Sequence, residues 1–316
     1  MRTPRTRRLC IVAPNDDDHA SYVRAIVEKR GGDVCFIDLA DLPRESRLTI
    51  PQDAPPVIEL PHHKVVFDSN LTVWWRRPQR LSFRDEVTDP RLRTFTARQW
   101  QLAFRSVSCL GQARWVNDPD KEEIASRKPV QLAAAIKAGF TVPQTLVSND
   151  PRQIRQFIDA AHGTNMRVIY KPLSSARFNF AETREVECID GFERELEIAP
   201  VIFQQYVPKG KDLRITIFGD MVVAAEVVSS QPIDWRIDLS HSYRITGLEP
   251  QLRRNIIELV AKLQLVTGSI DVRIDPEGCP YFFEVNPSGQ FLYMERYGCP
   301  NIGEEFVDFL CHDRCA

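Results

Sequence analysis

Apolar positions near the start of the chain follow a strand–helix–strand order. A buried strand is predicted over residues 9–13, a helix over residues 20–30 that ends at a glycine pair, and a second strand over residues 34–37. This spacing is typical of a βαβ unit and implies a parallel sheet. The turn after the first strand is acidic and has no glycine-rich phosphate loop, so we do not expect a dinucleotide there.

The rest of the chain mixes helical and strand patterns. Residues 40–70 are predicted as loops or a short hairpin. Helices are predicted over residues 88–112, 121–139 and 250–266, and strands over residues 168–171, 201–206, 213–218 and 221–228, with a hairpin over residues 269–274 and 280–285. Because Asn-Asp-Pro is a strong turn signal, Asn117-Asp118-Pro119 is expected to mark a boundary between an α/β domain and an α+β region.

Composition and charge exclude several classes of protein. The chain has 316 residues, a formal net charge of −2 and 43% apolar residues. This balance argues against a nucleic-acid binder and against a disordered chain. No apolar run reaches the length of about 18 residues that a membrane span needs, and the apolar stretch after the N-terminal arginines is too short for a signal peptide.

The eight cysteines are scattered and form no C-x-x-C pair, which favours a reduced, cytoplasmic protein. The C-terminal residues Cys311, His312 and Cys315 resemble half of a zinc site. Because the sequence offers no second half, we interpret them as an incidental tail.

The hairpin near the carboxyl end carries the sharpest chemical pattern. Glu284 and Asn286 lie two apart on one predicted strand, so they share a face, and Asp271 falls near Glu284 across the turn. Two carboxylates and an amide oxygen suit Mg²⁺, which takes one or two carboxylates together with waters and phosphates. A solvated sheet face is the alternative, but the apolar flanks of Glu284 suggest burial and hence a partner or a metal.

Two lysines are placed where a phosphate oxygen could be bound. Lys171 closes an apolar strand, and Lys128 lies near the start of a predicted helix. An ammonium at the end of a buried strand suits a phosphate. Each lysine alone is also consistent with a surface side chain whose stem packs on apolar neighbours.

Two further segments carry weaker signals. The connector from Gln204 to Arg214 joins two strands and offers backbone groups to a flat heterocycle, with Asp212 in reach of hydroxyls. Arg236 and Arg244 are candidates for a bidentate grip on a carboxylate or a phosphoryl group, although an exposed loop explains them as well. The sequence contains neither a nucleophile elbow nor a P-loop motif.

Taken in order, these residues resemble the ATP-grasp ligases from about residue 115 to residue 300. More narrowly, the chain resembles the microviridin-type ribosomal peptide maturases, or graspetide synthetases. The phrases that carry the resemblance are VWWRRP, WVNDPDKEEIASRKPVQLAAAIKAGFTVPQTLVSNDP, VIYKPLSS, FQQYVPKGKDLRITIFGD, DWRID and FFEVNPSGQF.

The resemblance implies a mixed α/β and α+β architecture: an ATP-grasp fold preceded by an α/β pre-ATP-grasp domain. The N-terminal domain would span residues 1–117, the central lid subdomain residues 118–205, and the C-terminal subdomain with the metal site residues 206–316. ATP would lie between the two α+β subdomains.

The resemblance also implies roles for single residues. Lys128 and Lys171 would contact the phosphates of ATP. The chain at Gln204, Gln205, Tyr206 and Val207 would bind adenine, and Asp212 the ribose. Asp271, Glu284 and Asn286 would hold Mg²⁺. Arg214 and Arg273, together with Arg236, would stabilise the transferring phosphoryl group and the acyl phosphate.

Two segments depart from the family pattern. The pair Gln204-Gln205 stands where a glutamate is frequent, and the loop over residues 172–177 lacks the glycines that many members place over the phosphates. Ser174 and Ser175 are candidates to substitute for those glycines.

The function implied is an ADP-forming carboxylate ligase acting on a ribosomal precursor peptide. An Asp or Glu side chain would become an acyl phosphate, and a Ser or Thr hydroxyl or a Lys amine would then close an ω-ester or ω-amide ring. The alternatives are a ligase for a free amino acid or small peptide, and a peptide-binding relic without turnover. Relatives are often homodimers, but the sequence leaves the oligomeric state, including a homodimer, open.

A local excess of arginine is relevant to the kind of peptide that the chain would bind. Residues 76–105 contain eight arginines against three acidic residues, which would attract an acidic peptide, although a solvated helix face is the favoured explanation of the excess. Neither a nucleic acid nor a membrane is expected as a partner.

Overall fold

The computed structural model describes residues 7–77, 81–173 and 183–312. The expectations for the first six residues, for Ser174 and Ser175, and for Cys315 fall outside this part of the chain. Two compact units are present. Unit 1 comprises Met1–Glu123, Leu265–Gly268 and Pro287–Ala316, and unit 2 comprises Ile124–Gln264 and Ser269–Asn286.

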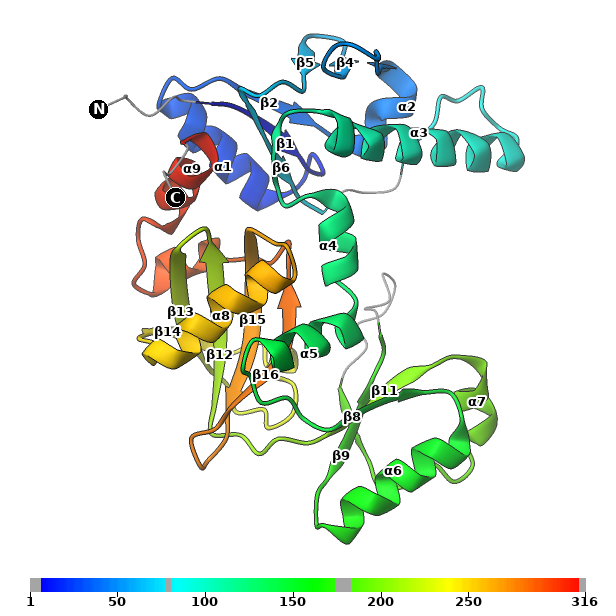
Figure 1. Cartoon of the computed structure of the whole chain (residues 1–316), viewed down its shortest axis with the longest axis vertical. Coiled ribbons are helices and arrows are strands. Elements are labelled where there is room, and N and C mark those ends of the chain that lie inside the picture. Colours follow the sequence, from blue (N-terminus) through cyan, green and yellow to red (C-terminus); the bar gives the residue numbers. More distant parts are fainter. Residues whose placement is uncertain (1–6, 78–80, 174–182, 313–316) are drawn as a thin grey trace. The chain divides into compact units, whose positions relative to one another are not determined.

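Unit 1 is built on a parallel sheet (Figure 1). Its strands, in spatial order, are β2 (Val34–Ile37), β1 (Arg8–Val12), β6 (Leu71–Trp75) and β7 (Arg114–Val116). Its main helices are α1 (Asp18–Lys29), α3 (Pro90–Leu110) and α9 (Ile302–Cys311). The predicted βαβ unit is therefore confirmed, and β1 is buried because both of its neighbours and the helices cover it.

Residues between β2 and β6 form more structure than the expected loops or hairpin. A short 3-10 turn over Leu39–Asp41 leads into α2 (Leu42–Glu45). A three-stranded antiparallel sheet follows, made of β3 (Arg47–Thr49), β4 (Val57–Glu59) and β5 (Lys64–Val66). Ile58 and Val65 anchor this sheet in the core of unit 1, which is why so polar a segment is ordered.

Unit 2 contains two antiparallel sheets. The first, in spatial order, consists of β10 (Arg184–Val186), β9 (Val168–Lys171), β11 (Val201–Gln205) and β8 (Thr145–Ser148). The helices α6 (Pro151–Gly163) and α7 (Glu193–Ile198) accompany it. The helix α6 begins at a capping residue, since the Asp150 side chain accepts from the Arg152 backbone N–H at 2.9 Å.

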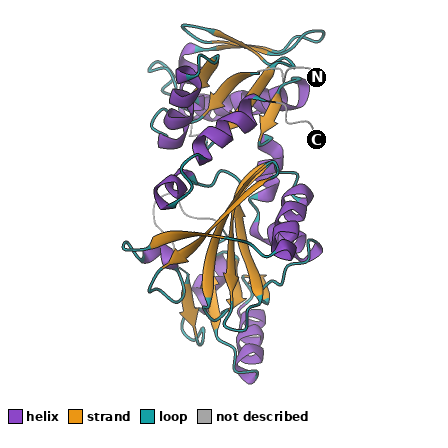
Figure 2. Cartoon of the chain, turned by 90° about the vertical axis from the view of Figure 1, so that its left-hand side faces the viewer, coloured by secondary structure: helices purple, strands orange, loops and turns teal. Residues whose placement is uncertain are grey.

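The second sheet of unit 2 has five strands (Figure 2). They are, in order, β14 (Ser242–Thr246), β13 (Met221–Val228), β12 (Lys211–Phe218), β15 (Thr267–Ile274) and β16 (Pro280–Asn286). The amphipathic α8 (Pro250–Lys262) buries Leu252, Ile256 and Leu259, as its apolar spacing predicts. The strand β16 lies at one edge of this sheet.

The single helix predicted over residues 121–139 is wrong. The structure has two helices there, α4 (Pro119–Ala125) and α5 (Lys128–Lys137). Pro129 has no N–H to continue a helix but is favoured in a first turn, so the chain breaks at Ser126 and Arg127 and starts again. The consequence is that Lys128 is the first residue of a helix.

The division into three segments, 1–117, 118–205 and 206–316, stays a prediction, since the structure divides into two compact units with other boundaries. The residues after β16 belong to unit 1, because α9 packs on α1 and Arg30 forms an ion pair with Asp308 at 2.7 Å. None of the helices in the described part of the chain combines the length and the apolar character needed to cross a membrane.

Candidate functional site

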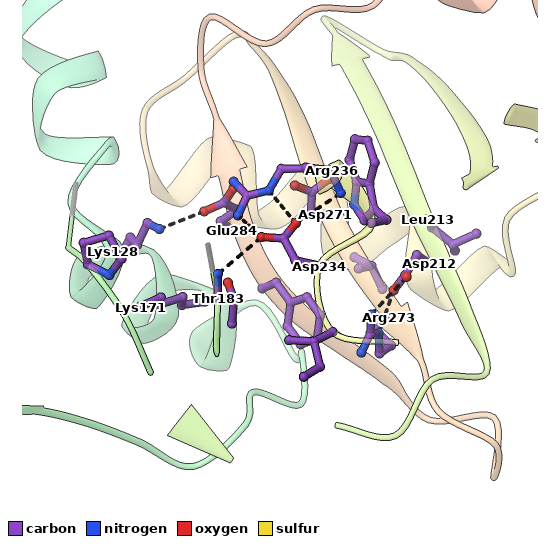
Figure 3. A pocket seen from close by; sticks show the side chains of 15 residues that line it. Lys128, Lys171, Thr183, Asp212, Leu213, Asp234, Arg236, Asp271, Arg273 and Glu284 are labelled. Carbon is purple, nitrogen blue, oxygen red and sulfur yellow. Dashed lines mark hydrogen bonds and ion pairs between the residues drawn. The ribbon is translucent and has the colours of Figure 1, made fainter. Parts of the chain in front are cut away.

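A polar pocket in unit 2 collects side chains from both of its sheets (Figure 3). Seven of the predicted site residues line it: Lys128, Lys171, Asp212, Arg236, Asp271, Arg273 and Glu284. Of the remaining predictions, Arg214, Gln204 and Val207 contact residues of the pocket, whereas Gln205, Tyr206 and Asn286 are not among its lining.

The paired carboxylates come from neighbouring strands. Asp271 on β15 lies opposite Glu284 on β16, so the pairing predicted for the hairpin is confirmed. The register shifts between Asp271 and Val272, which leaves Phe283 without a partner on β15. Such a bulge re-aims side chains, and it explains why the consecutive residues Phe283 and Glu284 both line the pocket.

The donor set fits a divalent cation of the magnesium type. Asp271 and Glu284 offer carboxylate oxygens, and Asn286 follows two residues along β16 on the same face. Among the described residues, no three His, Cys, Asp or Glu side chains form a metal cage by themselves. Mg²⁺ does not need one, because substrate phosphates and waters complete its shell.

Each carboxylate is neutralised by a cation in this structure. Arg214 donates to Asp271 at 2.8 Å, and the Lys128 ammonium lies 3.2 Å from Glu284. Burial alone would raise the pKa of Glu284, but Lys128 and its neighbours outweigh burial and hold that pKa below its ordinary value. Burial does raise the pKa of Asp271, because Arg214 opposes it only in part.

Lys171 is held at the end of β9 by a short polar chain. Its ammonium donates to the Gln204 side-chain oxygen at 3.0 Å, and Gln204 in turn donates to the Thr145 hydroxyl at 2.8 Å. Burial, reinforced by the nearby charge of Lys128, lowers the pKa of Lys171 to about 8. Gln204 therefore positions a lysine with its side chain, a role that its place in the connector did not reveal.

Arg273 and Asp212 form a buried ion pair. The guanidinium contacts the Asp212 carboxylate at 2.6 and 3.0 Å and also donates to the carbonyls of Val207 and Pro232. Arg273 is only 2% exposed. Its observed contacts fix two loops around the pocket, and the roles of Arg273 at a phosphoryl group and of Asp212 at a ribose stay predictions.

Arg236 is fixed by the segment between β13 and β14. It lies in a 3-10 turn over Trp235–Ile237, and its guanidinium pairs with Asp234 at 2.6 Å. The segment is tied together by Asp238, which accepts from the hydroxyls of Ser229 and Ser240. Arg244, the other candidate for a bidentate grip, pairs instead with Glu226 on an exposed face outside the pocket.

Gln131, which no sequence pattern singled out, is 2% exposed on α5. Its amide donates to the Val285 carbonyl at 2.8 Å, and the Val285 N–H donates back at 3.1 Å. Because β16 is an edge strand, the Gln131 side chain replaces a neighbouring strand at the residue between Glu284 and Asn286. A glutamine in an alanine-rich helix gives no signal of this role in the sequence.

Comparisons with known proteins find relatives of this chain by sequence and by fold. A family model described as a RimK-like ATP-grasp domain matches residues 125–310. A probable alpha-L-glutamate ligase 2 of Hahella chejuensis is 25% identical over 185 residues, and a probable alpha-L-glutamate ligase of Citrobacter koseri is 28% identical over 190 residues. These matches cover 56% and 58% of this chain but only 60% and 62% of the two relatives.

Solved structures match over nearly the whole chain. The macrocyclase MdnC of Microcystis aeruginosa, bound with its precursor peptide MdnA, is 25% identical with a TM-score of 0.81, and the match covers 96% of this chain and 99% of that one. A RiPP-associated ATP-grasp ligase of Chryseobacterium gregarium, in complex with ADP and leader and core peptides, has a TM-score of 0.84 at 24% identity and covers 98% and 100%.

The buried pair predicts a large effect on stability. Asp212→Ala leaves the Arg273 cation buried without its carboxylate, so the free energy of unfolding should fall by about 3–5 kcal/mol in urea titrations. The matched control is Arg244→Ala, which breaks the exposed pair with Glu226 and should change stability by about 1 kcal/mol or less.

A double variant tests whether the loss of stability in Asp212→Ala comes from the unpaired charge of Arg273. Asp212→Leu combined with Arg273→Met removes both charges and should recover most of the stability lost in Asp212→Ala. A loss in Asp212→Ala no larger than that in Arg244→Ala would contradict the importance of the buried pair.

Proposed function

Because the chain belongs to the RimK-like ATP-grasp family and has its fold, we propose that it is an ATP- and Mg²⁺-dependent, ADP-forming ligase for a ribosomal precursor peptide. Asp or Glu side chains of the peptide become acyl phosphates. Ser or Thr hydroxyls, or a Lys amine, then close ω-ester or ω-amide rings. The observation that carries the proposal is the pocket of unit 2, where Asp271, Glu284, Lys128 and Lys171 converge.

The likeness to a macrocyclase supports a peptide as the substrate. MdnC is described with a precursor peptide bound, and it matches this chain at 25% identity over almost its full length. The reaction balances without a nucleophile from the protein: a peptide carboxylate oxygen displaces ADP from the γ-phosphate, and the acceptor then displaces phosphate from the acyl carbon. Each ring therefore removes one water from the peptide.

The acidic and the basic residues of the pocket would have different roles. Asp271, Glu284 and Asn286 would hold Mg²⁺, which supplies neutralisation of the developing phosphate charge. Lys128 and Arg214 neutralise Glu284 and Asp271 in this structure. With a metal bound to these carboxylates, the two cations would be available to phosphate and acyl-phosphate oxygens. Lys171 and Arg236 border the same space, so the fold contributes positioned charge rather than covalent chemistry.

A second candidate function is the joining of a free amino acid or small peptide. The curated relatives, probable glutamate ligases at 25% and 28% identity, favour it. Both functions share the acyl phosphate, so the acceptor alone separates them. ADP release that depends on glutamate rather than on a precursor peptide would select this alternative.

Two further features belong to the same proposal. The seven cysteines in the described part of the chain are free thiols, which suits a cytoplasmic location. A homodimer is consistent with α3, which exposes Leu92, Phe95, Leu102 and Leu110, since large exposed apolar side chains mark association surfaces.

Removing one metal ligand should abolish ring formation. We expect Glu284→Gln to eliminate the loss of one water per ring, because Mg²⁺ loses a carboxylate. The substrate to use is an acidic precursor peptide, to be sought in the open reading frame beside this gene. Mass spectrometry after incubation with Mg²⁺ and ATP measures the change. Glu226→Gln, an isosteric change outside the pocket, should leave cyclisation intact, and cyclisation by Glu284→Gln would contradict the metal site.

The lowered pKa of Lys171 predicts a pH dependence of nucleotide affinity. With a pKa of about 8 the ammonium is charged at pH 7 and mostly neutral at pH 9, while the phosphates of ATP stay fully ionised. Affinity for Mg²⁺-ATP, measured by calorimetry, should therefore fall up to about tenfold over this range. Lys171→Arg keeps its charge and should show no such fall. A pH-independent wild type would contradict the assignment.

A further inference from the structure

The parallel sheet of unit 1 reverses its direction of growth between β1 and β6 (Figure 1). The chain first adds β2 on one side of β1 and later adds β6 and β7 on the other. In open α/β sheets, ligands bind outside the carboxyl ends of the strands at such a switch point. Val12 and Trp75, the last residues of β1 and β6, are paired, so the segments that follow them leave the sheet side by side.

A buried arginine marks this edge of the sheet. Arg76 follows β6 directly, is 2% exposed, and donates through Nε to the Asp17 carboxylate at 2.7 Å. Its Nη2 atom is also buried but has no hydrogen-bond partner among the described residues. A buried guanidinium N–H without an acceptor is unfavourable, so such a group in a native protein calls for an explanation, for example a bound water or ion or a functional role.

The next residue, Arg77, is held in a strained backbone conformation. Its φ is 44°, in the left-handed region that residues with a Cβ avoid. Strain of this kind persists where the surroundings enforce it, typically at functional sites. The exposed Arg77 side chain donates through Nε to the Ser288 carbonyl at 2.9 Å, two residues after Asn286 in the chain.

The buried groups at this edge compensate the charge of Arg76 only in part. Burial and Arg76 lower the pKa of His19 to about 4, so this histidine is neutral. Burial raises the pKa of Glu122 to about 7, although Ser288 donates to its carboxylate at 2.7 Å. At neutral pH the two guanidiniums therefore face the full charge of Asp17 and only part of a charge on Glu122. Asp16 and Asp18 of the same turn are exposed to solvent, so an anion would be bound by the buried guanidinium of Arg76 rather than attracted by a net positive charge.

We propose that Arg76 and Arg77, at the carboxyl edge of β6, bind a side-chain carboxylate of the acidic peptide, an inference that rests on the proposed function. Guanidinium groups match a carboxylate with two parallel N–H donors. The segment that begins at Arg76 carries eight arginines against three acidic residues up to residue 105, which suits a polyacidic peptide. The peptide carboxylate would accept from the open Nη2 atom of Arg76.

The test measures peptide binding without nucleotide. Fluorescence anisotropy with the labelled precursor compares wild type, Arg77→Ala and the control Arg24→Ala, which removes an exposed arginine of α1 in the same unit. We expect Arg77→Ala to weaken binding by about tenfold or more and Arg24→Ala by less than about twofold. Arg77 is exposed, so its variant should fold, and Arg76→Lys, with a charge but no fork, should show a loss similar to that of Arg77→Ala.

A second peptide, which lacks the core carboxylates, tests whether Arg77 recognises a carboxylate. With every Asp and Glu of the core changed to Asn and Gln, wild type and Arg77→Ala should bind equally. The proposed site is wrong if Arg77→Ala still binds this peptide more weakly than wild type does. It is also wrong if Arg24→Ala weakens binding of the acidic peptide as much as Arg77→Ala does. If Arg77→Ala instead weakens Mg²⁺-ATP, the edge binds phosphate and the proposal is wrong.

Failure of the proposed function has a separate signature. If wild type binds the acidic peptide in a manner that depends on Arg77 but forms no ring with Mg²⁺ and ATP, the carboxylate site stands and the ligase assignment falls. If rings form but peptide binding does not depend on Arg77, the ligase assignment stands and the carboxylate site falls.

Discussion

The pocket depends on neutralising two carboxylates that face one another across a hairpin. Asp271 and Glu284 are paired on β15 and β16 and are mostly buried, so their mutual repulsion must be neutralised. Arg214 and Lys128 provide that neutralisation in this structure. The same pairing is the reason that we propose these carboxylates as the place where a divalent cation would be held, with Lys128 and Arg214 beside it.

The surrounding structure keeps this arrangement in register. Gln131 binds the backbone of Val285 and so ties β16 to α5, whose first residue is Lys128. Arg273 joins Asp212 to the loops at Val207 and Pro232 on the other side of the pocket. Gln131 and Arg273 hold neighbouring parts of the backbone in place. Each one hydrogen-bonds to main-chain groups, of the edge strand or of the loops, that have no main-chain partner there among the described residues.

Local patterns in the sequence predicted the elements but not the long-range contacts. The pairing of Asp271 with Glu284 followed from strand alternation and a short turn, whereas the bulge at Phe283 depends on packing and left no local signal. The break before Lys128 was missed because apolar spacing continued through it, although Pro129 was visible. The pairing of Arg273 with Asp212 and the place of α9 beside α1 join residues far apart in the chain, which periodicity does not encode.

We propose that Asp271 and Glu284, on the hairpin of β15 and β16, would hold the metal ion that neutralises the phosphates of ATP. A crystal structure of the protein with Mn²⁺ and a non-hydrolysable ATP analogue, with the metal located by anomalous scattering, tests it most directly. We predict a metal within coordination distance of oxygens of both Asp271 and Glu284 and in contact with phosphate oxygens of the analogue. A metal or terminal phosphates bound away from these two carboxylates would contradict it.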